Sequence, residues 1–355
     1  MASKGLDQLL VGDLVHPGDS TRESSAALIW LTGFGGTSGM ALVGPEVRMF
    51  ATDFRYAERA EGELPSSFQR LTAERQLVDE LGPHLRGRVG FDPAATSVET
   101  HGKLAELIGD GTELVPEAEL LAGLRRSKDE TELQAIAEAA RLTDEVYLSI
   151  EQTGLTGRSE REVAIAAEVR MRELGAEAVA FPPIVASGTN GALPHAEPTA
   201  RAIEAGDLVT IDLGAIADGY ASDCTRTLAA GKRPSDEAAA VYELVLEAQL
   251  AGLASLRAGA PARDVDAAAR DVIVAGGHGE EFGHGLGHGV GIQVHEPPRL
   301  SKLSEDELCS GDVVTVEPGV YVAGRFGVRI EDLVVITEDG YENLSGRPKE
   351  LQVVG

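Results

Sequence analysis

The stretch 313–319, VVTVEPG, and the stretch 328–332, VRIED, are two strand-like runs on either side of a turn. The interval between Glu317 and Glu331 is centred on Gly324, so a hairpin folded there places the two glutamates opposite each other. Like charges in opposite positions destabilise a strand pair unless a cation lies between them. Arg329 is expected on the other face of its strand, where it does not neutralise the pair. The hairpin therefore predicts two converging carboxylates that need a cation.

A second pair of carboxylates follows the same pattern earlier in the chain. The runs 207–213 and 220–228 surround the turn at 217–219, Ala-Asp-Gly, and an Asp-Gly turn between strand-like runs is a strong hairpin signal. Folding at this turn brings Asp212 and Asp223 to neighbouring positions of paired strands. Each lies beside apolar residues, where a lone carboxylate is costly to bury. This pair is also expected to need a cation.

A histidine-rich segment lies between the two hairpins, at 283–298, GHGLGHGVGIQVHEPP. His284, His288 and His295 stand among alternating glycines, which allow the backbone to pass close to other atoms. The glycines argue against a helix, so the four-residue interval between His284 and His288 is not that of a helical HExxH zinc motif. Together with four converging carboxylates, this segment predicts a metal site.

The charge of these groups favours two metal ions over one. Four carboxylates and one imidazole oversupply a single divalent cation, but they suit a pair about 3.5 Å apart that shares bridging carboxylates. Ligation dominated by oxygen favours manganese or cobalt over a thiolate-rich zinc site, with zinc as a further alternative. Such a pair activates water near neutral pH, so the sequence predicts a hydrolytic site.

These residues resemble a known family, the pita-bread metallopeptidases (M24), and within it the Xaa-Pro peptidases, which are aminopeptidase P and prolidase. The resemblance covers nearly the whole chain. Its five ligand positions fall on Asp212, Asp223, His288, Glu317 and Glu331. The family's spacings are also kept, with 11 residues between the aspartates, 29 from histidine to glutamate and 14 between the glutamates. The flanking strings 219–227 and 327–332 fit as well.

The resemblance implies a role for each ligand. Asp223 and Glu331 are expected to bridge two divalent metal ions, and Asp212 to chelate one of them. His288 and Glu317 are expected to hold the other. Glu317 is further expected to act as the general base that takes a proton from the attacking water.

The resemblance also implies substrate-side residues around the metals. His195 lies 17 residues before Asp212, where the family places a histidine beside the substrate. His295 is expected to contact the scissile carbonyl or the proline and so to stabilise an oxyanion. His284 fits a further substrate-side histidine, and Arg329 is placed to bind a carboxylate or to link the two histidine loops.

The expected fold class is α+β, with two domains. A C-terminal pita-bread catalytic domain spans 123–355 and follows a smaller creatinase-like α/β domain at 1–122, which the strings 32–34 and 52–56 resemble. In the smaller domain, strands are predicted at 26–31, 41–43, 47–51 and 88–91, and helices at 66–81 and 97–108. The glycine-rich stretch 32–39 lacks the third glycine of GxGxxG and is interpreted as a strand-to-strand loop.

The larger domain is expected to begin with a long helix that opens at 124–130. Ser127 is its predicted N-cap, and Glu130 completes a capping box. Further helices are predicted at 159–174, 235–256 and 262–275. Strands are predicted at 207–213, 220–228, 312–322 and 328–336.

Composition limits the partners and the location. The 355 residues carry a net charge of −27, which opposes binding to nucleic acid or to anionic membranes. Bound divalent ions would offset four of the acidic groups, and the rest fit a soluble or salt-adapted protein. Two cysteines, Cys224 and Cys309, in a chain without a signal peptide or an apolar span predict a reduced, cytoplasmic protein. A homodimer is what the resemblance implies.

The predicted function is release of an N-terminal residue that precedes proline, by a dinuclear Xaa-Pro aminopeptidase acting on proline-containing peptides. The main alternative is an Xaa-Pro dipeptidase (prolidase) limited to dipeptides. Creatinase-like hydrolases and binding scaffolds on this fold usually lack the ligands, all of which are kept here. Methionine aminopeptidases lack the N-terminal domain.

Overall fold

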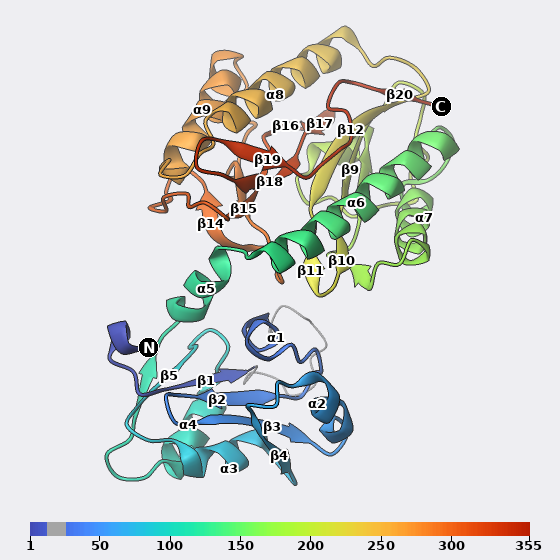
Figure 1. Cartoon of the computed structure of the whole chain (residues 1–355). Coiled ribbons are helices and arrows are strands. Elements are labelled where there is room, and N and C mark those ends of the chain that lie inside the picture. The colour runs from blue at the N-terminus through green and yellow to red at the C-terminus, as the bar shows by residue number, and fades with distance from the viewer. Residues whose placement is uncertain (13–25) are drawn as a thin grey trace. The chain divides into compact units, whose positions relative to one another are not determined.

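The computed structural model describes residues 1–12 and 26–355. These residues form two compact units, Met1–Arg125 and Arg126–Gly355 (Figure 1).

The first unit is built on one mixed sheet. Its described strands run in the order β4-β3-β2-β1-β5-β6, with parallel pairing of β3 with β4, β1 with β5, and β5 with β6. The strands β1 to β6 are Gln8–Gly12, Met40–Val43, Arg48–Asp53, Gln69–Ala73, Arg88–Phe91 and Glu113–Pro116.

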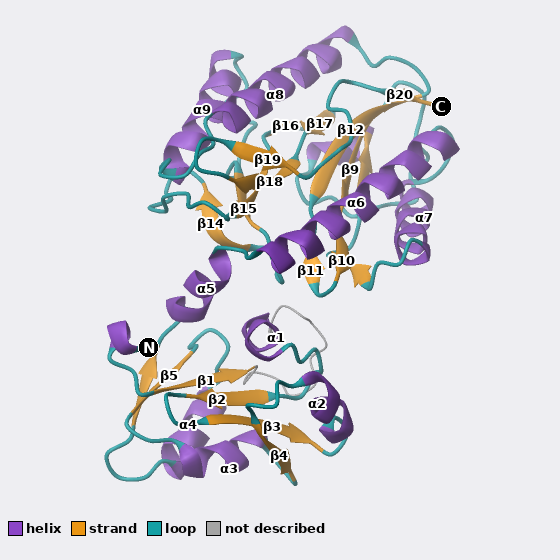
Figure 2. Ribbon diagram, viewed as in Figure 1, coloured by secondary structure: helices purple, strands orange, loops and turns teal. Residues whose placement is uncertain are grey.

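Helices cover both faces of this sheet (Figure 2). The helices α1 to α4 are Ala26–Thr32, Ala57–Glu63, Leu77–Leu81 and Val98–Leu107. Leu9 and Val11 pack in one apolar cluster with residues of α1 and α2, whereas Leu10, between them, packs with residues of α3 and α4. This alternation follows from the two-residue period of a strand.

Two predicted elements of this unit are wrong. The segment 26–31 is helix α1 and not a strand, so the glycine-rich loop after it connects a helix to β2. An apolar run this short does not distinguish a strand from a buried helix by periodicity. Within 66–81, the predicted helix is replaced by β4 and the short α3. Because β4 is an edge strand with mostly exposed side chains, it lacks an alternating apolar pattern.

The second unit is framed by long helices. The helices α5 to α9 are Glu119–Arg126, Glu130–Thr153, Glu160–Glu173, Asp236–Ala254 and Ala262–Ala275, the first of which crosses the unit boundary. The N-cap of α6 is Asp129, with Glu132 completing its capping box, and not the predicted Ser127 and Glu130. Both pairs have the same three-residue interval, but the hydroxyl of Ser127 donates instead to the carbonyl of Ser310.

The strands of the second unit form several small sheets. The strands β7 to β13 are Ala178–Val179, Ile184–Ser187, Leu208–Leu213, Ala215–Ala217, Tyr220–Ala221, Cys224–Ala230 and Gly287–Gly289. The strands β14 to β20 are Glu296–Leu300, Val313–Val316, Gly319–Val322, Phe326–Arg329, Asp332–Ile336, Tyr341–Asn343 and Val353–Val354. The main sheets run β20-β12-β9-β8 and β14-β13-β15-β18-β19.

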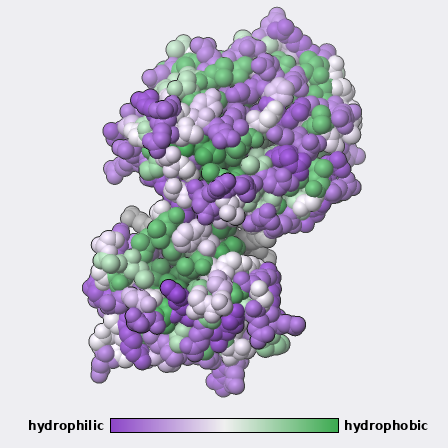
Figure 3. Space-filling model, viewed as in Figure 1, coloured by the Kyte–Doolittle hydropathy of each residue, from purple (hydrophilic) through white to green (hydrophobic). Residues whose placement is uncertain are grey.

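Helices pack against both main sheets, and α6 contacts residues of both. One apolar cluster joins α6 and α7 to β8, β9 and β12, and another joins α8 and α9 to β15–β18. Hydrophilic residues make up much of the visible surface of this unit (Figure 3). None of the helices in the described part of the chain combines the length and the apolar composition that a bilayer crossing requires.

Candidate active site

One cavity of about 710 Å³ in the second unit is lined by every site residue predicted from the sequence. These residues are His195, Asp212, Asp223, His284, His288, His295, Glu317, Arg329 and Glu331.

The strands are interrupted where the carboxylates lie. Three predicted strands are each broken into two, at Asp223, at Glu317 and at Glu331. The register nevertheless continues across the second hairpin, because Val316 pairs with Asp332 on one side of the gap and Gly319 pairs with Arg329 on the other. Glu317 and Glu331 therefore lie opposite each other, as the spacing predicts.

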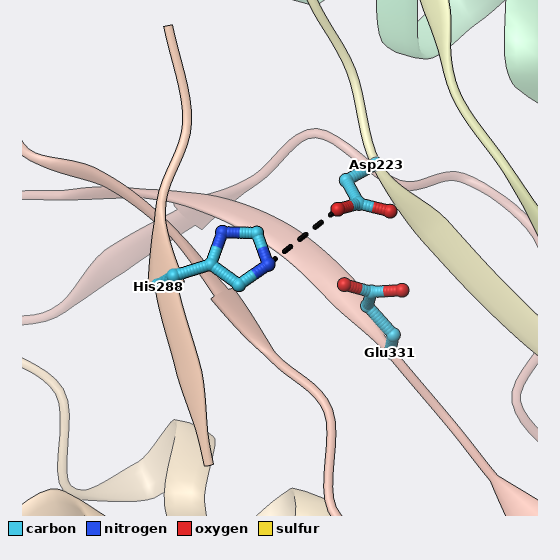
Figure 4. Close-up of side chains that lie close together, drawn as sticks. All are labelled: Asp223, His288 and Glu331. Atoms are coloured by element: carbon cyan, nitrogen blue, oxygen red, sulfur yellow. Dashed lines mark ion pairs between the residues drawn. The ribbon is translucent and has the colours of Figure 1, made fainter. Parts of the chain in front are cut away.

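Asp223, His288 and Glu331 point toward one another (Figure 4). One ligand atom from each lies within 4.8 Å of the others, an arrangement that could hold a metal ion. His288 Nε2 lies 3.6 Å from Asp223 Oδ2 and 3.4 Å from Glu317 Oε1. His288 Nδ1 lies 3.1 Å from the carbonyl oxygen of Gly289, which only accepts, so Nδ1 carries the proton and Nε2 presents its lone pair.

Arg329 points into the cavity, and the expectation that it faces away is wrong. Arg329 and Glu331 are two positions apart, and residues at this interval share a face of an extended chain. Arg329 Nη2 donates to Asp212 Oδ2 at 2.6 Å, and its Nε donates to Thr225 Oγ1 at 3.0 Å. The buried guanidinium therefore places a positive charge among the carboxylates.

The protein's own groups do not stabilise the ionised form of all the carboxylates in this cavity. Burial raises the pKa of Glu317 to about 8, with Arg329 opposing the rise and the charge of Asp212 adding to it. Burial, followed by the charge of neighbouring carboxylates, also raises the pKa of Asp223 and of Glu331 well above their ordinary values. Arg329 alone does not compensate this charge.

A divalent cation fits this donor set. Asp212 Oδ1 is buried and has no hydrogen-bond partner among the described residues, which leaves a carboxylate oxygen free to ligate. The remaining donors are carboxylate oxygens and an imidazole nitrogen, the groups that suit manganese, cobalt or zinc. Cations bound here would compensate the charge that raises the pKa of Glu317.

The other three histidines differ in how they are held. His284 Nδ1 faces the carbonyl of Gly285 at 2.8 Å, so it donates there. The Tyr321 hydroxyl accepts from Arg329 Nη1 at 2.8 Å and therefore donates its proton to His284 Nε2, at 3.1 Å. Both ring nitrogens of His284 are thus occupied by protein partners. Burial lowers its pKa to about 4, so the ring is neutral at neutral pH.

His195 and His295 line the cavity from exposed positions. The ring of His295 lies against that of His288, with centroids 4.2 Å apart. These two side chains, in contrast to His284, reach the open part of the site where a substrate would enter.

Two further residues of the site were not predicted, Thr225 and Tyr321. The Thr225 hydroxyl donates to Glu331 Oε2 at 2.7 Å and so orients one carboxylate of the group that could hold a metal ion. Thr225 lies two positions after Asp223, and Tyr321 lies eight before Arg329, across the β16–β17 hairpin. The two-residue period of a strand signals Thr225, whereas the position of Tyr321 depends on the tertiary fold.

The glycines of the histidine segment serve the protein's own packing. A side chain at Gly287 would collide with the carbonyl of Thr315, and one at Gly289 with the carbonyl of Pro297. The close approach predicted from these glycines is therefore to neighbouring strands, and it places His288 against the β15 strand.

A cavity in an α+β domain that brings together the four predicted carboxylate ligands and four histidines is typical of metal-dependent hydrolases. The chain belongs to metallopeptidase family M24, whose model matches residues 134–338. The model of the Creatinase/Prolidase N-terminal domain matches residues 1–127. The predicted family, the predicted fold class and the prediction of a peptidase are confirmed.

The chain is similar to named peptidases along nearly its whole length. An uncharacterised peptidase of Bacillus subtilis is 40% identical over 335 residues, which are 93% of this chain and 94% of that protein. The solved structure of an Xaa-Pro dipeptidase from Bacillus anthracis has a TM-score of 0.92 at 36% identity and covers 99% of this chain and 96% of its own. An X-Pro aminopeptidase from Thermotoga maritima has a TM-score of 0.89 at 34% identity, with coverage of 99% and 98%.

Proposed function

We propose that this chain is a metal-dependent exopeptidase that hydrolyses the bond between an N-terminal residue and a following proline. The convergence of Asp223, His288 and Glu331 within one cavity carries this proposal. The similarity to an Xaa-Pro dipeptidase and to an X-Pro aminopeptidase supports the choice of bond.

The length of the peptide substrate distinguishes two forms of this proposal. The sequence predicts an aminopeptidase that accepts longer peptides, and the relative from Bacillus anthracis favours a dipeptidase. Hydrolysis rates for Ala-Pro and Ala-Pro-Ala, measured side by side, decide between them. Cleavage of both indicates the aminopeptidase, and cleavage of Ala-Pro alone indicates the dipeptidase.

Asp212, Asp223, His288, Glu317 and Glu331 would hold two divalent cations, for which manganese is the first choice. Bound there, these cations would supply an activated water nucleophile and polarise the scissile carbonyl.

The chain's own groups have distinct tasks in this proposal. Arg329 orients Asp212 through the 2.6 Å hydrogen bond and holds the Tyr321 hydroxyl. Glu317, ionised once the surrounding charge is compensated, accepts the proton of the attacking water. His195 and His295 contact the substrate from the open side of the cavity, where an imidazole N–H can stabilise the oxyanion.

The first prediction is that activity on Xaa-Pro substrates depends on a bound metal. Treatment with a chelator should abolish cleavage, and added manganese should restore it, with cobalt and zinc tested in parallel. Asp223→Asn should bind manganese at least about tenfold more weakly in calorimetry, because it removes a charged ligand. Asp218→Asn is the matched control, since Asp218 lies in the nearby turn at φ 47°, which asparagine tolerates. Cleavage that survives chelation would contradict the proposal.

We also propose where catalysis takes place in the chain and how the chain assembles. We assign catalysis to the domain 123–355 and no catalytic group to the domain 1–122. The homodimer implied by the resemblance can be measured by light scattering, and the cytoplasmic location stays a prediction.

A further inference from the structure

A buried glutamate outside the cavity gathers an unusual number of hydrogen bonds. Glu160, the first residue of α7, is fully buried. Its Oε1 accepts from the backbone N–H and the hydroxyl of Ser187, both at 2.7 Å. Its Oε2 accepts from Asn190 Nδ2 at 2.8 Å and from the backbone N–H and hydroxyl of Thr199, at 2.9 and 2.6 Å.

These donors lie at both ends of one loop. Ser187 ends β8, which pairs with β9, the strand of Asp212. Thr199 lies twelve residues further on, and the loop between them carries His195. One carboxylate therefore closes the loop that presents His195 to the cavity.

His195 has little else to hold it. Its ring makes no hydrogen bond within the described residues, and its position is exposed. Among the described residues, the neighbouring backbone is held by Arg329 Nη1, which donates to the carbonyl of Pro194 at 3.1 Å, and by Asn190 Nδ2, which donates to the carbonyl of Glu197 at 3.2 Å. The placement of the ring thus depends on the placement of its loop.

We infer that Glu160 is a positioning residue for His195: its carboxylate fixes the loop 187–199 and so sets where His195 meets the substrate. This inference rests on the proposed peptidase function. It assigns a task to a residue that touches neither the metal ligands nor the cavity.

The charge of Glu160 is needed for this arrangement. A carboxylate only accepts, so its two oxygens can share their lone pairs among the five donors, whereas a glutamine amide presents two N–H groups of its own and would confront at least one donor of the loop. Burial raises the pKa of Glu160, but the hydrogen bonds from Thr199 and Ser187 outweigh it and lower the pKa overall, so the group is ionised at neutral pH. Leaving buried N–H groups without an acceptor loosens the loop.

A double-mutant cycle tests the inference on the manganese-loaded protein. We compare kcat/KM for Ala-Pro and Ala-Pro-Ala in the wild type, Glu160→Gln, His195→Ala and the double variant. Glu160→Gln should lower kcat/KM at least about tenfold, since small displacements of a positioned group are costly. In the His195→Ala background the same change should cost less than about twofold, because its effect passes through His195.

A second readout does not depend on activity. Hydrogen exchange at the amides of Ser187 and Thr199 should be faster in Glu160→Gln than in the wild type, in metal-free and loaded protein alike. Glu168→Gln, on the exposed side of the same helix, is the matched control and should change neither exchange nor kcat/KM.

The outcomes separate the inference from the proposed function. An equal loss from Glu160→Gln with and without His195, or unchanged exchange in the loop, overturns the inference and leaves the peptidase intact. A wild type that cleaves neither peptide overturns the proposed function itself. If Glu160→Gln does not fold, Asn190→Ala is the substitute, because it removes one of the five donors. It should lower kcat/KM about threefold when His195 is present and leave it unchanged in the His195→Ala background.

Discussion

The acidic residues of the cavity make the metal-free protein sensitive to pH. The folded protein raises the pKa of Glu317 to about 8, chiefly by burial, so it holds a proton that the unfolded chain releases above the ordinary value of 4.5. Stability therefore falls as pH rises through this range. His284 and His288, whose pKa burial lowers to about 4, act in the opposite direction, but only below pH 6.5.

The second prediction is a loss of stability between pH 6.5 and 8 in chelator-treated protein. The unfolding midpoint should fall by roughly 2 °C over this interval, since the buried carboxylates with a raised pKa hold protons in the folded protein that the unfolded chain has already released. Manganese should remove the trend, because the cation replaces the proton. A midpoint that rises with pH in the metal-free protein contradicts the assignment of these pKa shifts. Calorimetry in matched buffers, with and without manganese, measures the pH trend of the midpoint and its removal by the cation.

At the scale of the element, α9 holds the loop that carries His284. Arg270 and Asp266 form a buried ion pair on this helix, with Arg270 Nε 2.7 Å from Asp266 Oδ2. Arg270 also donates to the carbonyls of Phe282 and His284, and Asp266 accepts from the N–H of Leu286. The two residues therefore compensate each other's charge and also bind three backbone groups of one loop.

The third prediction concerns this pair. Arg270→Met should destabilise the protein by about 3 kcal/mol, because it leaves Asp266 buried without its partner. Replacing both residues, as Asp266→Leu with Arg270→Met, should remain destabilising, since the loop's backbone groups lose their partners. Arg263→Met, at an exposed position of the same helix, should change stability by less than about 0.5 kcal/mol. Urea unfolding measures all three, and recovery in the double variant would contradict the role of the loop contacts.

At the scale of the whole molecule, the apolar clusters of the described residues divide cleanly. Two belong entirely to the unit Met1–Arg125, and the other three to Arg126–Gly355. The predicted domain boundary at residue 123 also keeps Arg126 with its partner Asp312, at 2.7 Å, and Lys128 with Glu296, at 2.7 Å. The part 123–355 thus retains its core and these two ion pairs.

The fourth prediction is that the fragment 123–355 folds alone and binds manganese. Its unfolding should be cooperative in calorimetry, because each unit buries its own core. A fragment 129–355 should be several kcal/mol less stable, since it loses the partners of two buried carboxylates, Asp312 and Glu296. Equal stability of the two fragments would show that these ion pairs do not support the fold.

How much of this protein the sequence predicts depends on the range of the interaction. The register between Glu317 and Glu331 and the hairpin at Asp218 are local, so turn chemistry and the two-residue period predict them. The predictions for 26–31 and 66–81 are wrong because neighbours distant in the chain decide between helix and strand there.

The sequence by itself determined the family, the order and spacing of the five expected ligands, and the two hairpins that carry four of them. The tertiary structure alone decided that these hairpins, more than 80 residues apart, meet in one cavity with Arg329 turned inward. It also decided that a buried glutamate on α7 closes the loop of His195. Such contacts form only when distant segments bury their apolar faces together, and no local pattern encodes them.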